Sequence, residues 1–315
     1  MSDQENLHKL HKSVLINEVM QAFELSDNIA HSQKRAKIID ATLGLGGHTE
    51  QLVKHGIQVL GIDEDNEMLE LADKRLKETC PTPEKNFRGS YSLVKGSFKD
   101  ILEIAKKNNF LNADGILFDL GVSSPQLTSK TRGISFQENS ARLDMRLDRV
   151  EMGITAADML NMLREDQLVQ MFNVTMNPRL SRRLSTQIVV YRKIKPFGTV
   201  GDLKNVVGRV LSKKGRKSPE TLPFLALRIA VNSELTSIDD GLTDAIKVLS
   251  NFGRIVVISF HSGEDKLVKK VFSRFESQNL GKEITKKPIT PSEYEISENA
   301  RSRSALLRIF EKNEK

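Results

Sequence analysis

The sequence predicts an α/β fold, in which an open, mostly parallel sheet carries helices on both faces and is interrupted by a helical insertion. In the first third of the chain, short apolar runs alternate with segments of helical periodicity. Such alternation of strand and helix builds parallel sheets. After Gly121 the apolar pattern becomes helical, and a β-branched run returns only after Gly253. Two separate stretches of sequence are therefore expected to form one sheet.

Each predicted strand is a short apolar run, and each predicted helix shows apolar residues at spacings of three and four. The strands are expected at Lys37–Asp40, Gln58–Asp63, Ser92–Gly96, Asp114–Asp119, Gly253–Phe260 and Ser304–Phe310. The helices of the sheet domain are expected at His48–His55, Asn66–Lys77, Lys99–Lys107, Leu225–Leu235, Ile238–Leu249 and Glu264–Phe275. Helices at Ala156–Leu163 and Arg182–Val190 belong to the insertion. The predicted sheet domain comprises residues 1–131 and 218–315, and the predicted insertion residues 132–217.

Basic residues are concentrated in the insertion. The whole chain has 48 Lys and Arg, 41 Asp and Glu, and a net charge of +7. Residues 132–217 hold 17 basic and 8 acidic residues, so the remainder of the chain is slightly acidic. From Arg179 to Lys217, 12 basic residues accompany one acid, Asp202. A block this one-sided predicts a surface that binds a polyanion.

Composition excludes several classes of protein. No uninterrupted apolar run approaches the roughly 20 residues of a membrane helix, and the polar start Met1–Glu5 is neither a secretory signal nor a transit peptide. Cys80 is the single cysteine, which excludes an internal disulfide and a Cys-rich metal cage. No cluster of His, Cys and Asp has the spacing of metal ligands, so no metal is expected. These features predict a cytoplasmic protein without a membrane segment.

A glycine-rich turn predicts a nucleoside cofactor. Asp40–His48 contains Gly44, Gly46 and Gly47 directly after a predicted strand, and a second acid, Asp63, ends the next strand 23 residues after Asp40. Glycines at this place let the backbone approach a ligand, and a strand-terminal acid at about this distance reaches a ribose hydroxyl pair. Thr49 stands where a dinucleotide fingerprint needs a tiny residue. S-adenosylmethionine is therefore favoured over NAD, and a dehydrogenase is a distant alternative.

A candidate for the chemistry lies at the end of the fourth strand, in Phe118–Pro125. An exocyclic base amine is a poor nucleophile, and a carboxylate such as Asp119 would help by accepting a hydrogen bond from it. A turn or cap role is the alternative for Asp119. Methylation of a pyrimidine ring carbon needs a thiolate, and Cys80 lies in a Pro-rich turn away from this edge. Methylation of an amine and methylation of a ribose hydroxyl both remain open.

Several motifs together resemble the RsmH (MraW) family, methyltransferases that modify the N4 amine of a cytosine in the decoding centre of small-subunit (16S) rRNA. They follow in family order over nearly the whole chain: His11–Glu18, Asp40–His48, Asp119–Gln126, Arg132–Phe136, Leu143–Arg146, Ala226–Asn232, Ser259–Ser262 and Arg301–Ala305. The resemblance implies a class I (Rossmann-like) methyltransferase sheet with an inserted helical domain that recognises RNA.

The resemblance also implies roles for particular residues. The cofactor S-adenosylmethionine would be bound by Gly46, Gly47, His48, Asp63, Phe98, Asp119 and Gln126. Asp119 would in addition be the catalytic residue. Arg179 and Arg183 would bind the substrate from the insertion. The target base is stacked in RNA, so it is expected to be flipped out before it reacts.

The implied partner is small-subunit ribosomal RNA or the small ribosomal subunit, and the family makes a homodimer possible. The alternatives are a methyltransferase acting on another RNA position and a non-catalytic RNA-binding assembly factor. The chain departs from the family pattern at Pro178, Leu222, Leu225, Gly263 and Ala300. All five positions lie outside the implied cofactor pocket.

Overall fold

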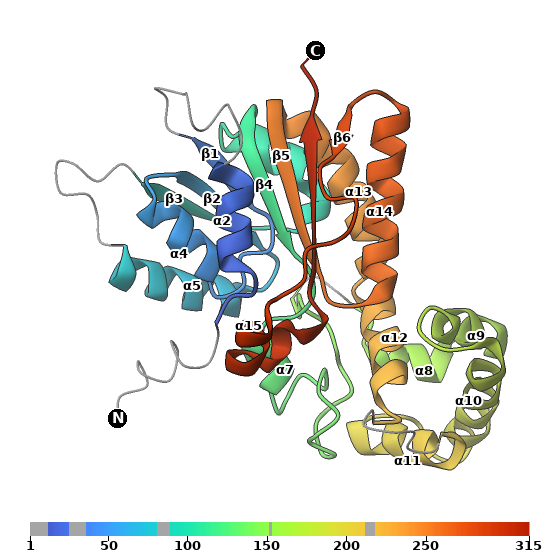
Figure 1. Cartoon of the computed structure of the whole chain (residues 1–315). Coiled ribbons are helices and arrows are strands. Elements are labelled where there is room, and N and C mark those ends of the chain that lie inside the picture. Colours follow the sequence, from blue (N-terminus) through green and yellow to red (C-terminus); the bar gives the residue numbers. More distant parts are fainter. Residues whose placement is uncertain (1–11, 25–35, 81–88, 151–152, 212–217, 315) are drawn as a thin grey trace. The chain divides into compact units, whose positions relative to one another are not determined.

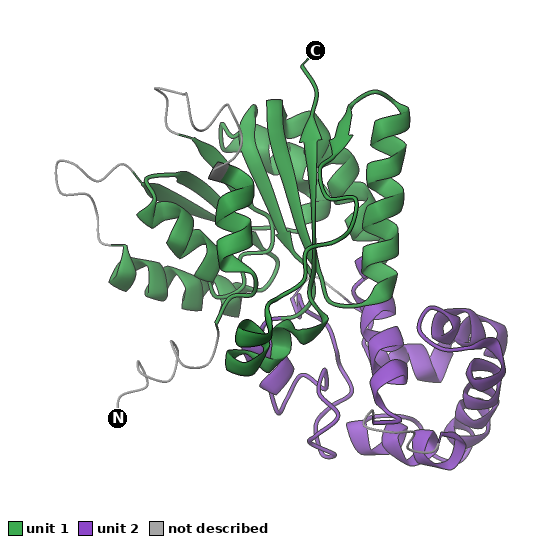
Figure 2. Ribbon diagram, in the orientation of Figure 1, with its two compact units in different colours: residues 1–122, 235–315 green, residues 123–234 purple. Residues whose placement is uncertain are grey.

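A computed structural model of the chain describes residues 12–24, 36–80, 89–150, 153–211 and 218–314. The chain divides into two compact units (Figure 2), of which one comprises residues 1–122 and 235–315 and the other residues 123–234. We call them the sheet unit and the helical unit. The helical unit begins before the predicted boundary at 132. It also reaches beyond the predicted boundary at 217, because helix α12 (Thr221–Val231) packs against α8 (Ala156–Met162) and α9 (Glu165–Asn173) of the insertion. His11, where the first family motif begins, lies outside the described residues.

The sheet unit contains one seven-stranded sheet in the order β3-β2-β1-β4-β5-β7-β6 (Figure 1). Strands β1 to β5 pair in parallel, and β7 pairs antiparallel with both β5 and β6. The predicted mostly parallel sheet is thus confirmed. The strands are β1 Lys37–Asp40, β2 Gln58–Asp63, β3 Ser90–Lys95, β4 Ala113–Asp119, β5 Leu249–Ser259, β6 Gly281–Glu283 and β7 Leu306–Lys312. Strand β6 was not predicted, since three residues with one glycine carry no periodic signal.

Helices cover both faces of this sheet and form a three-layer arrangement. Alternate residues of a strand point to opposite faces, so Ile38 packs into one apolar core and its neighbour Ile39 into the other. The first core includes residues of α2 (Ile16–Glu24), α4 (Gly47–Lys54) and α5 (Asn66–Thr79). The second includes residues of α6 (Ile101–Lys107), α13 (Glu234–Val248) and α14 (Ser262–Ser277).

The predicted helix Leu225–Leu235 is wrong in extent. Helix α12 ends at Val231, and α13 already begins at Glu234. Between them Ser233 adopts a φ of 50°, in the left-handed region that interrupts a right-handed helix. The amide of Asn232 accepts a hydrogen bond from Leu147 N–H and donates one to the carbonyl of Met145, each at 2.9 Å. This side chain therefore ties the irregular segment before α8 to the end of α12.

The helical unit consists of helices joined by irregular segments. Its helices are α7 Ser124–Thr128, α8 Ala156–Met162, α9 Glu165–Asn173, α10 Pro178–Arg192, α11 Val200–Val210 and α12. Helix α10 packs against α9 on one side and α11 on the other. Pro178 occupies the first turn of α10 after the N-cap Asn177, a position where the fixed φ of proline suits a helix. The family departure at Pro178 thus has a local structural explanation.

Asp202 holds α11 against the end of α10. Its carboxylate accepts hydrogen bonds from the Lys195 ammonium at 2.6 Å, the Tyr191 hydroxyl at 3.1 Å and the Thr199 backbone at 2.9 Å. Burial opposes ionisation, but these donors outweigh it and keep the pKa of Asp202 well below its usual range. The only acid between Arg179 and Lys217 therefore has a structural role.

Within the described ranges no helix is both long and apolar enough to cross a membrane.

Candidate functional site

Three acids end three neighbouring strands of the sheet unit. Asp40 ends β1, Asp63 ends β2 and Asp119 ends β4, and β1 lies between the other two strands. The chain winds outward from β1 to β3 in one direction and from β4 to β5 in the other. Open parallel sheets bind ligands outside the carboxyl ends of their strands at such a reversal. The sheet topology therefore brings the three acids predicted from sequence to one ligand-binding edge.

The glycine turn after β1 requires its glycines. Gly44 and Gly46 have φ values of 51° and 71°, and Gly46 is the N-cap of α4. A Cβ atom on Gly47 would collide with the hydroxyl of Ser13, which is buried against the start of that helix. The Gly44 N–H donates a hydrogen bond of 2.8 Å to Asp63 Oδ2. The turn is thus joined directly to the acid at the end of β2.

Asp40 and Asp63 differ in exposure and in role. Asp40 is 1% exposed and accepts a hydrogen bond of 2.7 Å from the hydroxyl of Thr49, which anchors α4 to β1. Asp63 is partly exposed and accepts from the N–H groups of Gly44 and Asp65. Burial raises the pKa of Asp63 to about 7 despite these bonds. Asp40 therefore positions the turn, whereas Asp63 can still face a ligand.

Asp119 carries a buried oxygen that has no hydrogen-bond partner among the described residues, Oδ1. Its other oxygen, Oδ2, lies 3.7 Å from Nδ1 of His48, whose Nε2 is 2.9 Å from the carbonyl of Val14. The backbone N–H of Asp119 donates to the hydroxyl of Thr42 at 2.6 Å. Burial raises the pKa of Asp119 to about 6, and the nearby His48 opposes that rise. An unpartnered buried acceptor is costly in a folded protein unless a ligand supplies a donor.

Phe98 follows β3 and lies partly exposed in the same unit. Its ring meets the ring of Phe118 edge to face, with centroids 5.7 Å apart. The start of the short helix Phe98–Asp100 also packs closely on Gly241 of α13, where a Cβ atom would press on the Phe98 ring. Phe118 and Gly241 thus hold the Phe98 ring in place.

Gln126, Arg179 and Arg183 belong to the helical unit. Gln126 is buried in α7, and its amide oxygen accepts a hydrogen bond of 2.9 Å from Ser123 N–H, as part of a capping box. Ser123 is the N-cap of the same helix. Both side chains thus contribute to the cap of α7, and a cofactor role for Gln126 stays a prediction.

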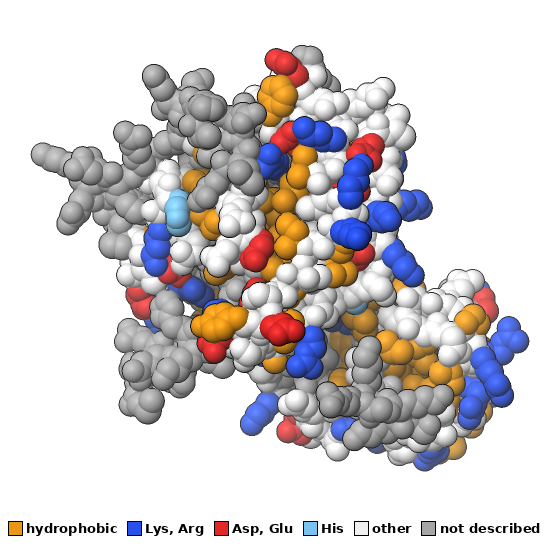
Figure 3. Space-filling view, in the orientation of Figure 1, with side chains coloured by type: hydrophobic (Ala, Val, Ile, Leu, Met, Phe, Trp, Pro, Cys, Tyr) orange, Lys and Arg blue, Asp and Glu red, His pale blue; other side chains and the backbone are white. Residues whose placement is uncertain are grey.

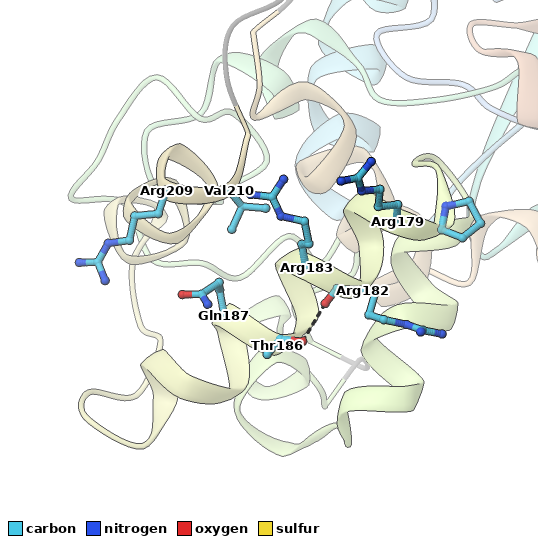
Figure 4. A pocket seen from close by; sticks show the side chains of 8 residues that line it. Arg179, Arg182, Arg183, Thr186, Gln187, Arg209 and Val210 are labelled. Atoms are coloured by element: carbon cyan, nitrogen blue, oxygen red, sulfur yellow. Dashed lines mark hydrogen bonds between the residues drawn. The ribbon is translucent and has the colours of Figure 1, made fainter.

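An open groove between α10 and α11, of about 800 Å³, contains both predicted arginines (Figure 4). Its lining residues are Pro178, Arg179, Arg182, Arg183, Thr186, Gln187, Arg209 and Val210. Arg179, Arg183 and Gln187 recur at four-residue spacing and so share one face of α10. In Figure 4 the Arg183 side chain points toward Val210 of α11, and Arg182 points to the other side of α10.

The charge in this groove is uncompensated. The four arginine side chains are exposed, and within the described ranges none of them forms an ion pair with a carboxylate. Arg209 donates instead to the amide oxygen of Asn205 at 3.1 Å. Lys and Arg side chains gather along the outer edge of the helical unit in Figure 3. Unpaired guanidinium groups on one surface attract polyanions, because a phosphate replaces the missing counter-charge.

Several residues of these sites were not predicted. Thr42, Thr49 and Ser13 support the glycine turn and the Asp119 backbone, and Arg209 joins the groove from α11. Thr42 and Thr49 lie inside or beside the glycine motif, which is the one signal that could have indicated them. Ser13 lies in the family motif His11–Glu18, whereas Arg209 has no such signal, because only the folded chain brings it to the groove.

The sheet order, the antiparallel β7 and the glycine turn with its strand-terminal acids define a class I methyltransferase. The profile of the MraW methylase family matches residues 8–313, and the chain belongs to that family.

Three relatives carry the name ribosomal RNA small subunit methyltransferase H. The protein of a Sulfurihydrogenibium species is 38% identical over 304 residues, which are 95% of this chain and 98% of that protein. The Dictyoglomus thermophilum protein is 38% identical over 98% of this chain and 99% of its own length. The Sulfurihydrogenibium azorense protein is 40% identical over 95% and 98%. The family predicted from sequence is thus confirmed.

Proposed function

We propose that this chain transfers a methyl group from S-adenosylmethionine to the N4 amine of a cytosine in small-subunit ribosomal RNA. The relatives at 38% and 40% identity are named for action on small-subunit rRNA, and they align over nearly their whole length. The observation that carries the proposal is the unpartnered, buried Asp119 Oδ1, which calls for a ligand group that donates a hydrogen bond. An acceptor in that state fits a ligand that donates an N–H, and an exocyclic amine is such a group.

The residues at the carboxyl edge fit S-adenosylmethionine. Gly46 and Gly47 are buried and let the turn after β1 fold tightly against Ala72 and Ser13, and His48 lies in the first turn of α4. Asp63, at the end of β2, would accept from the ribose hydroxyls, and Phe98 would lie against the adenine. When bound, the cofactor supplies an electrophilic methyl group on its sulfonium.

Asp119 would make the amine a better nucleophile. An amine whose lone pair is delocalised into the ring gains electron density on nitrogen when its N–H donates to a carboxylate. The same carboxylate would stabilise the positive charge that develops on nitrogen and then accept the proton that N4 loses. His48 beside Oδ2 and Thr42 at the backbone hold Asp119 in place, so little reorganisation is needed.

Of two alternative methylation targets, the structure disfavours one, a pyrimidine carbon. Carbon methylation of a pyrimidine requires a thiolate, but burial raises the pKa of the single cysteine, Cys80, and so disfavours its thiolate form. A ribose hydroxyl needs a base too, yet Asp119 as a hydrogen-bond acceptor would serve either group. The product therefore has to be identified chemically.

The helical unit would bind the RNA. Arg179 and Arg183 line a groove without acidic partners, and such residues contact phosphates rather than particular bases. Arg209 of α11 extends the same surface. We assign to this unit the affinity for RNA, and to the sheet unit the cofactor and the chemistry.

The proposed function predicts N4-methylcytidine as the product. Small ribosomal subunits that lack the modification would be incubated with the protein and labelled S-adenosylmethionine, digested, and separated as nucleosides by mass spectrometry. We expect one labelled N4-methylcytidine per subunit. A 2′-O-methylated nucleoside would instead support the ribose alternative. Cofactor binding without any methylated nucleoside would contradict the proposal.

The pKa of Asp63 predicts how cofactor affinity depends on pH. Only the ionised carboxylate can accept from both ribose hydroxyls while holding Gly44, and its pKa is raised to about 7. As the pH falls through 7, Asp63 is protonated, so Kd for S-adenosylmethionine should rise by up to about tenfold per pH unit. Calorimetry between pH 6 and 9 would measure this rise. Asp63→Asn should bind more weakly and show only the pH dependence of the ligand itself; an unchanged pH profile in this variant would exclude Asp63 as the group responsible.

A further inference from the structure

Two buried polar atoms without a hydrogen-bond partner follow neighbouring strands of the sheet unit. Among the described residues, the buried side-chain atoms that lack a partner are Asp119 Oδ1, His261 Nε2 and, in the helical unit, Ser185 Oγ. Asp119 ends β4 and pairs in register with Ile258 of β5, and His261 follows Ile258 by three residues. The two unpartnered atoms of the sheet unit therefore belong to the same ligand-binding edge.

The contacts of His261 identify its free nitrogen as a donor. His261 is the N-cap of α14, and its Nδ1 accepts the backbone N–H groups of Gly263 at 3.1 Å and Glu264 at 3.3 Å. A nitrogen that accepts these bonds carries no hydrogen, so the ring proton is on Nε2. Nε2 lies 3.1 Å from Glu264 Oε1 but outside hydrogen-bonding geometry. The ring is thus fixed with an N–H group that no described residue accepts.

Glu264 connects His261 to Asp119. Its carboxylate is buried, with 1% exposure, and Oε2 accepts from the backbone N–H of Phe260 at 2.8 Å. Burial is the main reason that the pKa of Asp119 is raised, and the charges of Asp40 and Glu264 raise it further. Glu264 is therefore close to both groups. Its Oε1 lies 3.1 Å from Nε2 of His261, and its charge acts on Asp119.

We propose that the Nε2–H of His261 recognises the ring nitrogen N3 of the target base, next to Asp119 at the exocyclic amine. The proposal rests on the proposed function and deepens it by explaining the choice of base. Along this edge cytosine presents a donor, N4–H, followed by an acceptor, N3. Asp119 as acceptor and His261 as donor match both. Uracil presents the reverse order, so both buried groups would stay unpaired, and a site of this kind rejects such an analogue strongly.

Two substitutions separate this role from that of the helix cap. His261→Asn keeps an acceptor near the position of Nδ1, and Asn is a good N-cap, but it removes the Nε2 donor. His261→Gln keeps a donor near the position of Nε2 and weakens the cap. We expect His261→Asn to retain the wild-type Tm and affinity for S-adenosylmethionine and to lose roughly 10- to 100-fold in kcat/KM. His261→Gln should retain more activity despite a lower Tm. The opposite ranking of activities would show that His261 is only a cap and would overturn the proposal.

A modified substrate tests the contact itself. Small subunits would be reconstituted with rRNA that carries 3-deazacytidine, in which a C–H replaces N3, at the methylated position. The wild type should lose about as much in kcat/KM on this substrate as His261→Asn loses on cytidine, and the variant should lose little more. If the loss in kcat/KM from the variant and the loss from the modified base multiply when the two are combined, His261 does not contact N3. That result would contradict this inference and leave the proposed function intact. If the wild type fails to methylate unmodified subunits, the proposed function is lost and this inference with it.

Discussion

Replacing Asp119 with alanine is expected to reduce kcat by roughly 10²- to 10⁴-fold, the range for a positioned acid–base group. The variant loses the acceptor that orients the amine and the charge that stabilises the developing cation. Because Asp119 is only one of the groups proposed to hold the cofactor, Kd for S-adenosylmethionine should change by no more than about tenfold. Single-turnover methyl transfer to small subunits, together with calorimetry of cofactor binding, measures the two effects separately.

The folded protein should tolerate the loss of the Asp119 carboxylate. Burial raises the pKa of Asp119 to about 6, so its ionised form is less favourable in the folded than in the unfolded state. The contribution of this group to stability therefore falls as the pH rises from about 4 to 6. At pH 8, Asp119→Asn should have a Tm at least equal to that of the wild type. Residues that serve a reaction often carry such a cost in stability.

A carboxylate at the other end of the same strand provides a matched control. Asp114 lies near the start of β4 and accepts a hydrogen bond of 2.8 Å from the backbone of Lys37. Asp114→Asn removes a charge from the same strand at the opposite edge of the sheet, so kcat should stay near the wild-type value. Asp119→Ala activity close to that of Asp114→Asn would contradict the catalytic role of Asp119.

Removing two arginines from the groove is expected to weaken RNA binding in a salt-dependent manner. Each phosphate contact contributes roughly 0.7 to 0.9 to the slope of log K against log salt concentration. Arg179→Gln with Arg183→Gln should therefore lower the slope by about 1.4 to 1.8, and should weaken binding roughly 30-fold at physiological salt. Filter binding of small-subunit rRNA over a series of salt concentrations would measure both quantities.

Arg164 is the control for this experiment, because it is an exposed arginine of the same unit that already has a partner. Its guanidinium forms an ion pair with Asp166 at 3.0 Å. Arg164→Gln should leave the salt slope nearly unchanged. Loss of affinity for S-adenosylmethionine in the double variant would contradict the division of labour between the two units. An unchanged slope would exclude the groove as a phosphate-binding surface.

The sheet and the acids at its edge could be predicted from the sequence because both depend on local patterns. A buried strand between two layers of helices is a short apolar run, and a nucleoside-binding turn needs glycine wherever φ is positive, as at Gly44 and Gly46. The basic excess of the insertion was equally visible, because charge is a property of composition. Helix ends were less predictable. The break at Ser233 depends on one left-handed residue and on the side chain of Asn232, which reaches a segment far away in the chain.

The kind of fold, the glycine turn and the three acids that end β1, β2 and β4 follow from local sequence patterns, since strand periodicity and turn chemistry act between near neighbours. How those residues are used depends on contacts that form only in the folded chain. The folded chain supplies Asp40 with a hydrogen bond from Thr49 and makes Gln126 part of a helix cap, whereas it leaves Asp119 Oδ1 and His261 Nε2 buried without a hydrogen bond. It also places Arg209 of α11 in one groove with the arginines of α10. Hydrogen-bond partners and surface neighbours come from segments that are distant in the chain, and the order of residues does not specify which of them will meet.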